Sequence, residues 1–174
     1  MGFGSVIATA LCVVVLIAAG YILISGITRS ADVTAATMKS ADDIKNRQLK
    51  TDLTITGVLG HREGNLSLDV NNVGGEKIVN ITRMDVILKF ADSGSNVVAA
   101  YWVPYRQAGQ TNGIYWENAG ISSITGDTIN PGILDPGETM TVKITGDTAF
   151  PTGAGTVLVA SPDGVSATAQ FIAN

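Results

Sequence analysis

The distribution of apolar residues divides the chain into two parts with different periodicities. Residues 6–27 (VIATALCVVVLIAAGYILISGI) form an almost wholly apolar run of 22 residues, and no charged side chain occurs from Phe3 to Ile27. As a helix rising ~1.5 Å per residue, this run would be ~33 Å long, enough to cross a hydrocarbon core of ~30 Å. The pattern therefore predicts a single transmembrane helix over residues 1–28.

The next segment, residues 28–50, is polar but contains neither Gly nor Pro. A thin apolar stripe near helical spacing runs through Ala31, Ala35, Met38 and Leu49. The segment is therefore expected to continue the helix as a stalk over residues 29–50. A partly frayed linker is the alternative, because so thin a stripe gives an isolated helix little support.

From Thr51 onward the apolar period changes to two, which is typical of half-buried antiparallel strands. Turn residues (Gly, Asn, Asp and Pro) punctuate the pattern at 60–64, 72–75, 92–95, 135–137 and 162–164. Short strands separated in this way indicate an immunoglobulin-like antiparallel β-sandwich, so the fold class is α+β with a head at 51–174. The least regular stretch, 107–130, is expected to be a long connection between the sheets. Seven strands are predicted, at 52–57, 66–71, 84–90, 97–103, 140–144, 157–159 and 165–171.

Composition and charge exclude several classes of function. The formal net charge is −4, the wrong sign for binding nucleic acid through its phosphates. The single cysteine, Cys12, lies within the apolar run, and His61 is the only histidine. No nucleophile with a base, metal-ligand cluster or paired catalytic carboxylates stands out, so we expect no catalytic, cofactor or metal residues and no enzyme. Asp135 and Glu138 could help bind calcium, but a turn before a strand explains them more simply.

The aromatic residues gather in one third of the head. Most Tyr and Trp residues of such a set pack inside a core, but exposed ones also anchor protein interfaces. Tyr105, Tyr115 and Trp116 are the candidate partner-binding residues, with Tyr105 and Tyr115 expected to be the more exposed. The open edge strands of a sandwich are a further possible contact.

The side of the membrane on which the head lies is ambiguous. No Lys or Arg precedes the apolar run, and the run is longer than a signal-peptide core, so an uncleaved anchor is expected. The positive-inside rule places the head in the cytoplasm. A Thr-, Asn- and Gly-rich head and two N-glycosylation sequons, at Asn65 and Asn80, favour the outside instead. The basic residues after the helix are Arg29, Lys39, Lys45, Arg47 and Lys50.

Three stretches of the chain carry a resemblance to a known family. They are the start MGF with its apolar helix leading into LKTDLTI at 49–55, the stretch NNVGGEKI at 71–78 followed by MDVIL at 84–88, and NPGILDPGE at 130–138. This order of parts resembles the archaellum (archaeal flagellum) accessory protein F family within the archaellin superfamily. The motifs are short and structural, and accessory protein G and the archaellins share the same plan.

The resemblance implies a non-enzymatic role in motility. Proteins of this kind are held in the cell membrane by one span, with the sandwich in the space between the membrane and the surface layer. They act as stator components that bind surface-layer protein and accessory protein G, which implies a homo- or hetero-oligomer. The alternative is an archaellin- or pilin-like filament subunit whose N-terminal helix packs in a filament core; the absence of a Lys/Arg-Gly processing step before the helix favours the anchor.

Overall fold

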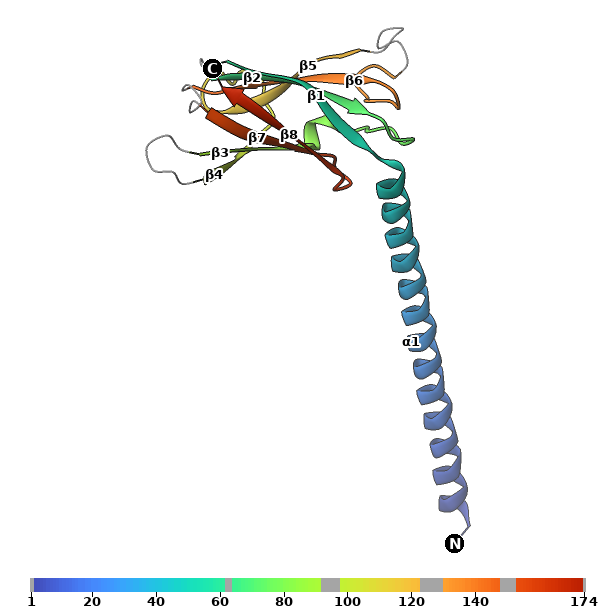
Figure 1. Ribbon diagram of the computed structural model, residues 1–174. Coiled ribbons are helices and arrows are strands. Elements are labelled where there is room, and N and C mark those ends of the chain that lie inside the picture. Colours follow the sequence, from blue (N-terminus) through green and yellow to red (C-terminus); the bar gives the residue numbers. More distant parts are fainter. Residues whose placement is uncertain (1, 62–63, 92–97, 123–129, 148–152, 174) are drawn as a thin grey trace. The chain divides into compact units, whose positions relative to one another are not determined.

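The computed structural model describes residues 2–61, 64–91, 98–122, 130–147 and 153–173 (Figure 1). The chain forms two compact units, Met1–Lys45 and Asn46–Asn174. The first unit is formed by most of the helix α1 (Phe3–Lys50), up to Lys45. The last residues of this helix, 46–50, belong to the second unit. By length and composition α1 is a helix that can cross a membrane. The helix continues without a break through the predicted stalk, so residues 29–50 are helical rather than a frayed linker.

Hydroxyl groups on α1 are satisfied within the helix itself. Thr9, Thr28 and Thr34 each donate a hydrogen bond to the carbonyl oxygen four residues earlier, at 2.8, 2.9 and 2.8 Å. Such a bond removes the cost of an unpaired hydroxyl on an apolar surface. None of the helical side chains is buried, so the apolar surface of residues 3–27 is available to lipid or to another helix.

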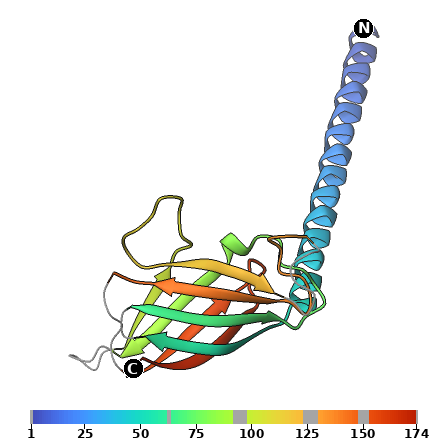
Figure 2. The ribbon, with the colours of Figure 1, turned by 90° about the horizontal axis from the view of Figure 1, so that it is seen from above.

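In the part of the chain that the structure describes, eight strands form a sandwich of two four-stranded antiparallel sheets, in the orders β4-β3-β7-β8 and β1-β2-β6-β5. The two layers are visible in Figure 1, and Figure 2 shows the second sheet with its strands side by side. The predicted fold class is therefore confirmed. The strands are β1 (Leu53–His61), β2 (Asn65–Asn72), β3 (Asp85–Ala91), β4 (Val98–Val103), β5 (Tyr115–Ser122), β6 (Thr139–Thr145), β7 (Gly153–Ala160) and β8 (Ser166–Ala173), with a short 3-10 helix, η1 (Ile81–Arg83), before β3.

The two sheets are linked along one side by a β-bridge and along the other side by backbone hydrogen bonds. A single parallel bridge between Gly60 and Ala173 links β1 to β8. On the opposite side the chain leaves β4 and runs beside β5. There the backbone N–H of Trp116 donates to the Pro104 carbonyl at 2.9 Å and the backbone N–H of Arg106 donates to the Trp116 carbonyl at 2.8 Å. The edge of β5 is covered at this point, whereas β4 ends its sheet with no strand beyond it among the described residues.

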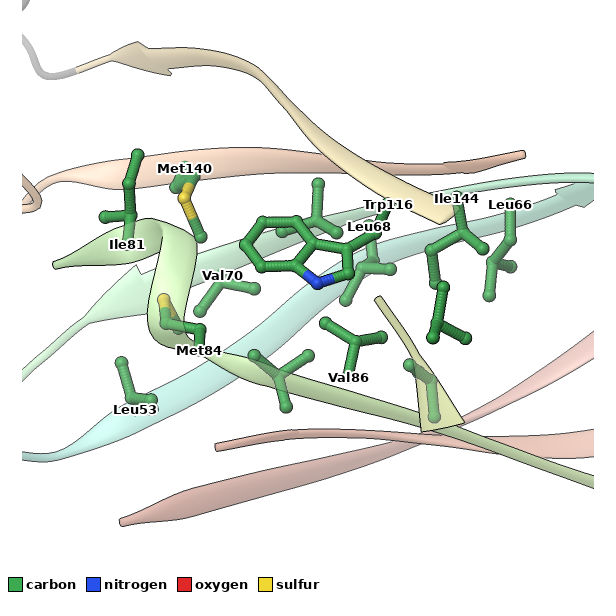
Figure 3. Packing of buried hydrophobic residues seen from close by; sticks show 14 of the residues in the cluster. Leu53, Leu66, Leu68, Val70, Ile81, Met84, Val86, Trp116, Met140 and Ile144 are labelled. Atoms are coloured by element: carbon green, nitrogen blue, oxygen red, sulfur yellow. The ribbon is translucent and has the colours of Figure 1, made fainter. Parts of the chain in front are cut away.

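The core lies between the sheets and follows the predicted alternation. In β2 every second side chain is buried, and β3, β6 and β7 contribute their inward residues in the same way. Trp116 lies in the middle of this cluster with none of its surface exposed, near Leu68, Val70 and Val86 (Figure 3). Burying one large aromatic side chain and the aliphatic residues around it is the main stabilising contribution of the fold.

Two of the stretches that carry the family resemblance meet at one end of the sandwich. The buried Asn72 side chain donates to the carbonyl oxygens of Glu76 (2.8 Å) and Leu134 (3.1 Å) and accepts the Gly74 N–H (3.1 Å). Ile78 forms an antiparallel bridge with Leu134. The conspicuous Asn72 of the first motif is thus explained by loop packing, since a buried amide must be hydrogen-bonded.

The last helical residues are built into the head unit. The Gln48 amide donates to the Asp163 carbonyl at 2.6 Å, and the Gly75 N–H donates to the Lys50 carbonyl at 2.7 Å. A Cβ at Gly74 would approach the Lys50 carbonyl oxygen to 2.5 Å, so only glycine fits there. The folded head unit therefore begins at Asn46, within the helix.

The strand count differs from the prediction at one place. Seven strands were expected, but β5 lies within 107–130, where an irregular connection was predicted. Its alternation is interrupted by a bulge between Asn118 and Gly120, at which the side-chain oxygen Oδ1 of Asn118 accepts the Gly120 N–H at 2.9 Å. The predicted turn at 92–95 lies outside the described residues, as does part of the one at 60–64.

Candidate protein-binding surface

Two of the three candidate aromatic residues are packed against each other. The rings of Tyr105 and Trp116 meet edge to face, with centroids 4.7 Å apart and planes at 79°. Trp116 is fully buried and Tyr105 is half-buried. This pair holds the segment after β4 against β5, so its visible role is to close the sandwich.

The third candidate, Tyr115, is covered by the connection between β4 and β5. Its side chain is only 7% exposed, with the Arg106 guanidinium 5.3 Å from its ring centre. Arg106 is held there by Glu117, whose carboxylate accepts its hydrogen bond at 2.6 Å. The hydrogen bond and the charge of Glu117 raise the pKa of Arg106. The expectation that Tyr115 is among the more exposed aromatic residues is therefore wrong.

The exposed aromatic residues lie instead on the edge strand β4. Trp102 is 61% exposed, Val98 55% and Tyr101 44%. Trp102 pairs with Ile87 of β3, which pairs in turn with Leu158 of β7, so that an apolar row crosses the outer face of the sheet. We call this region the β4 surface; on the outer face it comprises Ile87, Val98, Ala100, Trp102 and Leu158, and it also includes Tyr101, which pairs with the buried Leu88 and so lies on the inner side of the same edge strand.

Neighbouring side chains hold the two aromatic rings of the β4 surface in place. The Tyr101 ring stacks on Phe90 with centroids 5.0 Å apart. The Trp102 indole donates to the Asp85 carboxylate at 3.0 Å. The exposed Lys89, which pairs with Ala100, lies on the same outer face as Asp85. Apolar anchors beside charged groups are the usual composition of a protein interface.

The outer face of the other sheet has the opposite character. Thr139 donates to the Asn71 side chain at 2.6 Å, and Thr141 donates to Asp69 at 2.8 Å. The Asn71 amide donates to Thr56 at 3.0 Å. These polar side chains satisfy one another across three strands, so this face offers a partner little apolar area to bury.

A second apolar feature lies beside the junction of β1 and β8, on the side where the two sheets are joined. A shallow groove of about 650 Å³ is lined by Val58 and Leu59 of β1, by Phe171 and Ile172 of β8, and by three smaller contributors, Gly60, Ala154 and Gln170. Leu59 and Ile172 are both more than half exposed. The groove is open and carries no charged side chain.

The described residues contain no group of three or more His, Cys, Asp and Glu side chains that could hold a metal ion. The Asp135 and Glu138 pair forms a turn, in which the Glu138 carboxylate accepts the Asp135 N–H at 2.9 Å. The turn interpretation therefore holds for these two residues. The side chain of His61 lies outside the described residues.

Tyr101 and Trp102 belong to the aromatic group of the head but were not among the candidate partner-binding residues. The segment 98–103 is apolar at both odd and even positions, which is why its alternation looked weak. In a strand whose neighbours show clean alternation, apolar residues on both faces are a signal that the outward face has a partner. That signal could have identified the β4 surface.

Comparisons with known proteins agree with the fold and the motifs. The chain is 26% identical over 172 residues to an uncharacterized protein from Archaeoglobus fulgidus, covering 98% of this chain and 96% of that one. The archaellum periplasmic stator protein FlaG from Sulfolobus acidocaldarius has a TM-score of 0.51 at 20% identity, covering 70% of this chain and 99% of that chain. The archaellum periplasmic stator protein complex FlaF and FlaG from the same organism gives 0.51 at 18%, covering 68% and 87%.

These two structures share the fold of this chain. The model of the family described as archaeal-type flagellin matches residues 2–171, nearly the whole sequence. The resemblance to the archaellin superfamily is thereby confirmed, and this chain belongs to the archaeal-type flagellin family.

Proposed function

We propose that this chain is a membrane-anchored component of the archaellum stator. In this proposal α1 spans the cell membrane, and the sandwich lies in the space between the membrane and the surface layer. The head binds surface-layer protein and a second accessory chain of the protein G type, and it performs no catalysis. The observation that carries the proposal is the combination of an apolar α1 with a sandwich that shares its fold with periplasmic stator proteins.

The β4 surface is the proposed contact with the second accessory chain. Among the described residues no strand lies beyond β4, and the edge strand of another sandwich can pair with the backbone groups along that side. Trp102 on the outer face and Tyr101 on the inner face of β4 then supply one aromatic anchor on each side of the new strand. The complex between the two different chains FlaF and FlaG supports a partner with the same type of head. Of the three earlier candidates, Trp116 and Tyr115 are buried in the free head, and the half-buried Tyr105 lies two residues after the end of β4.

A filament subunit is the second candidate, and one observation favours it. The family model spans α1 as well as the head, and α1 exposes apolar side chains all around its segment from Phe3 to Ile27. In a filament the same surface would pack against copies of itself, whereas in a stator it faces lipid.

Cell fractionation separates the two candidates. Cells carrying the tagged full-length chain are sheared to release filaments, and the remaining membranes are solubilised in mild detergent. The stator proposal expects the chain in the membrane fraction, from which it co-purifies with surface-layer protein and a G-type chain. Recovery of the chain as a stoichiometric component of the sheared filaments would overturn the proposal and support the filament subunit.

A further inference from the structure

The sequence contains two N-x-Ser/Thr sequons, Asn65-Leu66-Ser67 and Asn80-Ile81-Thr82, and the fold treats them very differently. We infer that Asn80 carries an N-linked glycan and that Asn65 does not. The inference rests on the proposed function in one respect, because the head must lie outside the cytoplasm to receive the sugar.

Asn80 is presented on a firm, exposed turn. It is exposed and immediately precedes η1, with φ −106° and ψ 70°, and its side chain caps nothing. Among the described residues its only hydrogen bond is made by its backbone carbonyl, which accepts the Arg83 N–H at 3.0 Å. Ile81 is 8% exposed and anchors the turn in the core, while Thr82 points outward and is exposed. The side-chain amide of Asn80 and the hydroxyl of Thr82 are therefore both accessible to the active site of a glycosyltransferase.

Asn65 is held in the interior of a sheet. It is the first residue of β2 and pairs with His61 of β1 on one side and Thr145 of β6 on the other. The next residue, Leu66, is completely buried, and Ser67 is half-buried between Leu59 and Lys143. Presenting this sequon to an enzyme would require breaking both ladders and exposing a core leucine, which costs a large part of the folding free energy.

The chemistry requires only a glycosyl donor of a common class. The donor is an oligosaccharide joined through its anomeric carbon to a polyprenyl phosphate or diphosphate lipid. The Nδ2 of Asn80 forms a bond to that carbon and loses one proton, and the bond from the carbon to the phosphate oxygen breaks. The lipid phosphate leaves with the bonding electron pair, so no oxidant or reductant is needed.

Intact-mass and peptide mass spectrometry of the full-length chain test the inference in an archaeal host with N-glycosylation. The unmodified sequence is expected to carry glycan on the peptide that contains Asn80 and none on the peptide that contains Asn65. Asn80→Gln and Thr82→Ala should remove all glycan mass. Thr82→Ser, which keeps the sequon, should retain it, and Asn65→Gln should change nothing.

Failure of the inference must be distinguished from failure of the proposed location. The variant Cys12→Ser/Ala108→Cys places a single thiol on an exposed turn of the head, and a membrane-impermeant maleimide is applied to intact and lysed cells. Labelling of intact cells with an unmodified Asn80, or with glycan on Asn65, overturns the glycan inference while the location stands. Labelling only after lysis overturns the outside location and the inference with it.

Discussion

Replacing Trp102 by alanine is expected to weaken binding of the head to a G-type accessory chain without unfolding it. A buried aromatic side chain contributes about 150 to 250 Å². With 61% of Trp102 exposed in the free head, about 90 to 150 Å² remains for a partner to cover. At ~25 cal/mol per Å² this amounts to about 2 to 4 kcal/mol, or roughly a 30- to 800-fold increase in Kd.

The assay is isothermal titration calorimetry between the purified head, residues 46–174, and the head of the accessory chain. Trp102→Phe keeps most of the ring but loses the indole N–H that donates to Asp85, so it should retain more affinity than the alanine variant. Ile172→Ala is the matched control, because Ile172 is 64% exposed on β8, at the opposite end of the sheet order from β4.

Unfolding in urea checks that the variant head is intact. The lost hydrogen bond between Trp102 and Asp85 is exposed, so the free energy of unfolding should fall by no more than about 1 kcal/mol. A Kd within threefold of the parent for Trp102→Ala would refute the reasoning that β4 is the contact. An equal loss in Ile172→Ala would refute it as well, because the effect would then not be specific to β4.

Two further predictions concern the stability of the head. Gly155→Ala should lower the free energy of unfolding by about 1 to 3 kcal/mol, because the new Cβ would lie within the packed ring of Phe171. Gly75→Ala should change it by less than about 0.5 kcal/mol, since the nearest atom to its Cβ is 4.0 Å away; equal losses in the two variants would contradict the packing argument. A head that begins at Thr51 should be about 1 to 3 kcal/mol less stable in urea than one that begins at Asn46, because it lacks the hydrogen bonds of the last helical turn; coincident unfolding curves would show that those bonds contribute nothing.

The helix and most strands could be predicted because local pattern decides them. A long run without proline that is apolar on every side has few alternatives to a helix, and α1 extends to Lys50 as expected. In β2 the alternation of Leu66, Leu68 and Val70 with polar residues directly reports which face is buried. The period of two follows from the pleat of the strand.

The missed strand and the misjudged aromatic residues depend on tertiary contacts. In β5 a bulge at Asn118 breaks the period, so only Trp116 marks the inward face clearly. Tyr115 points away from the core but is covered by Arg106 of the preceding loop, which Glu117 of β5 holds in place. No local sequence pattern reveals this pairing of Arg106 with Glu117. Trp102 is exposed because it lies on the outer face of the edge strand β4, and the alternation within a single strand does not reveal the order of strands in the sheet.

The central claim, that the head is an adhesive part of a static anchor, is tested most directly by its binding to surface-layer protein. Purified surface-layer protein from the same cells is immobilised, and the head, residues 46–174, is passed over it at increasing concentration. The account predicts saturable binding with a Kd below tens of micromolar. The absence of binding by a head that is folded, as judged by a cooperative urea transition, would contradict it.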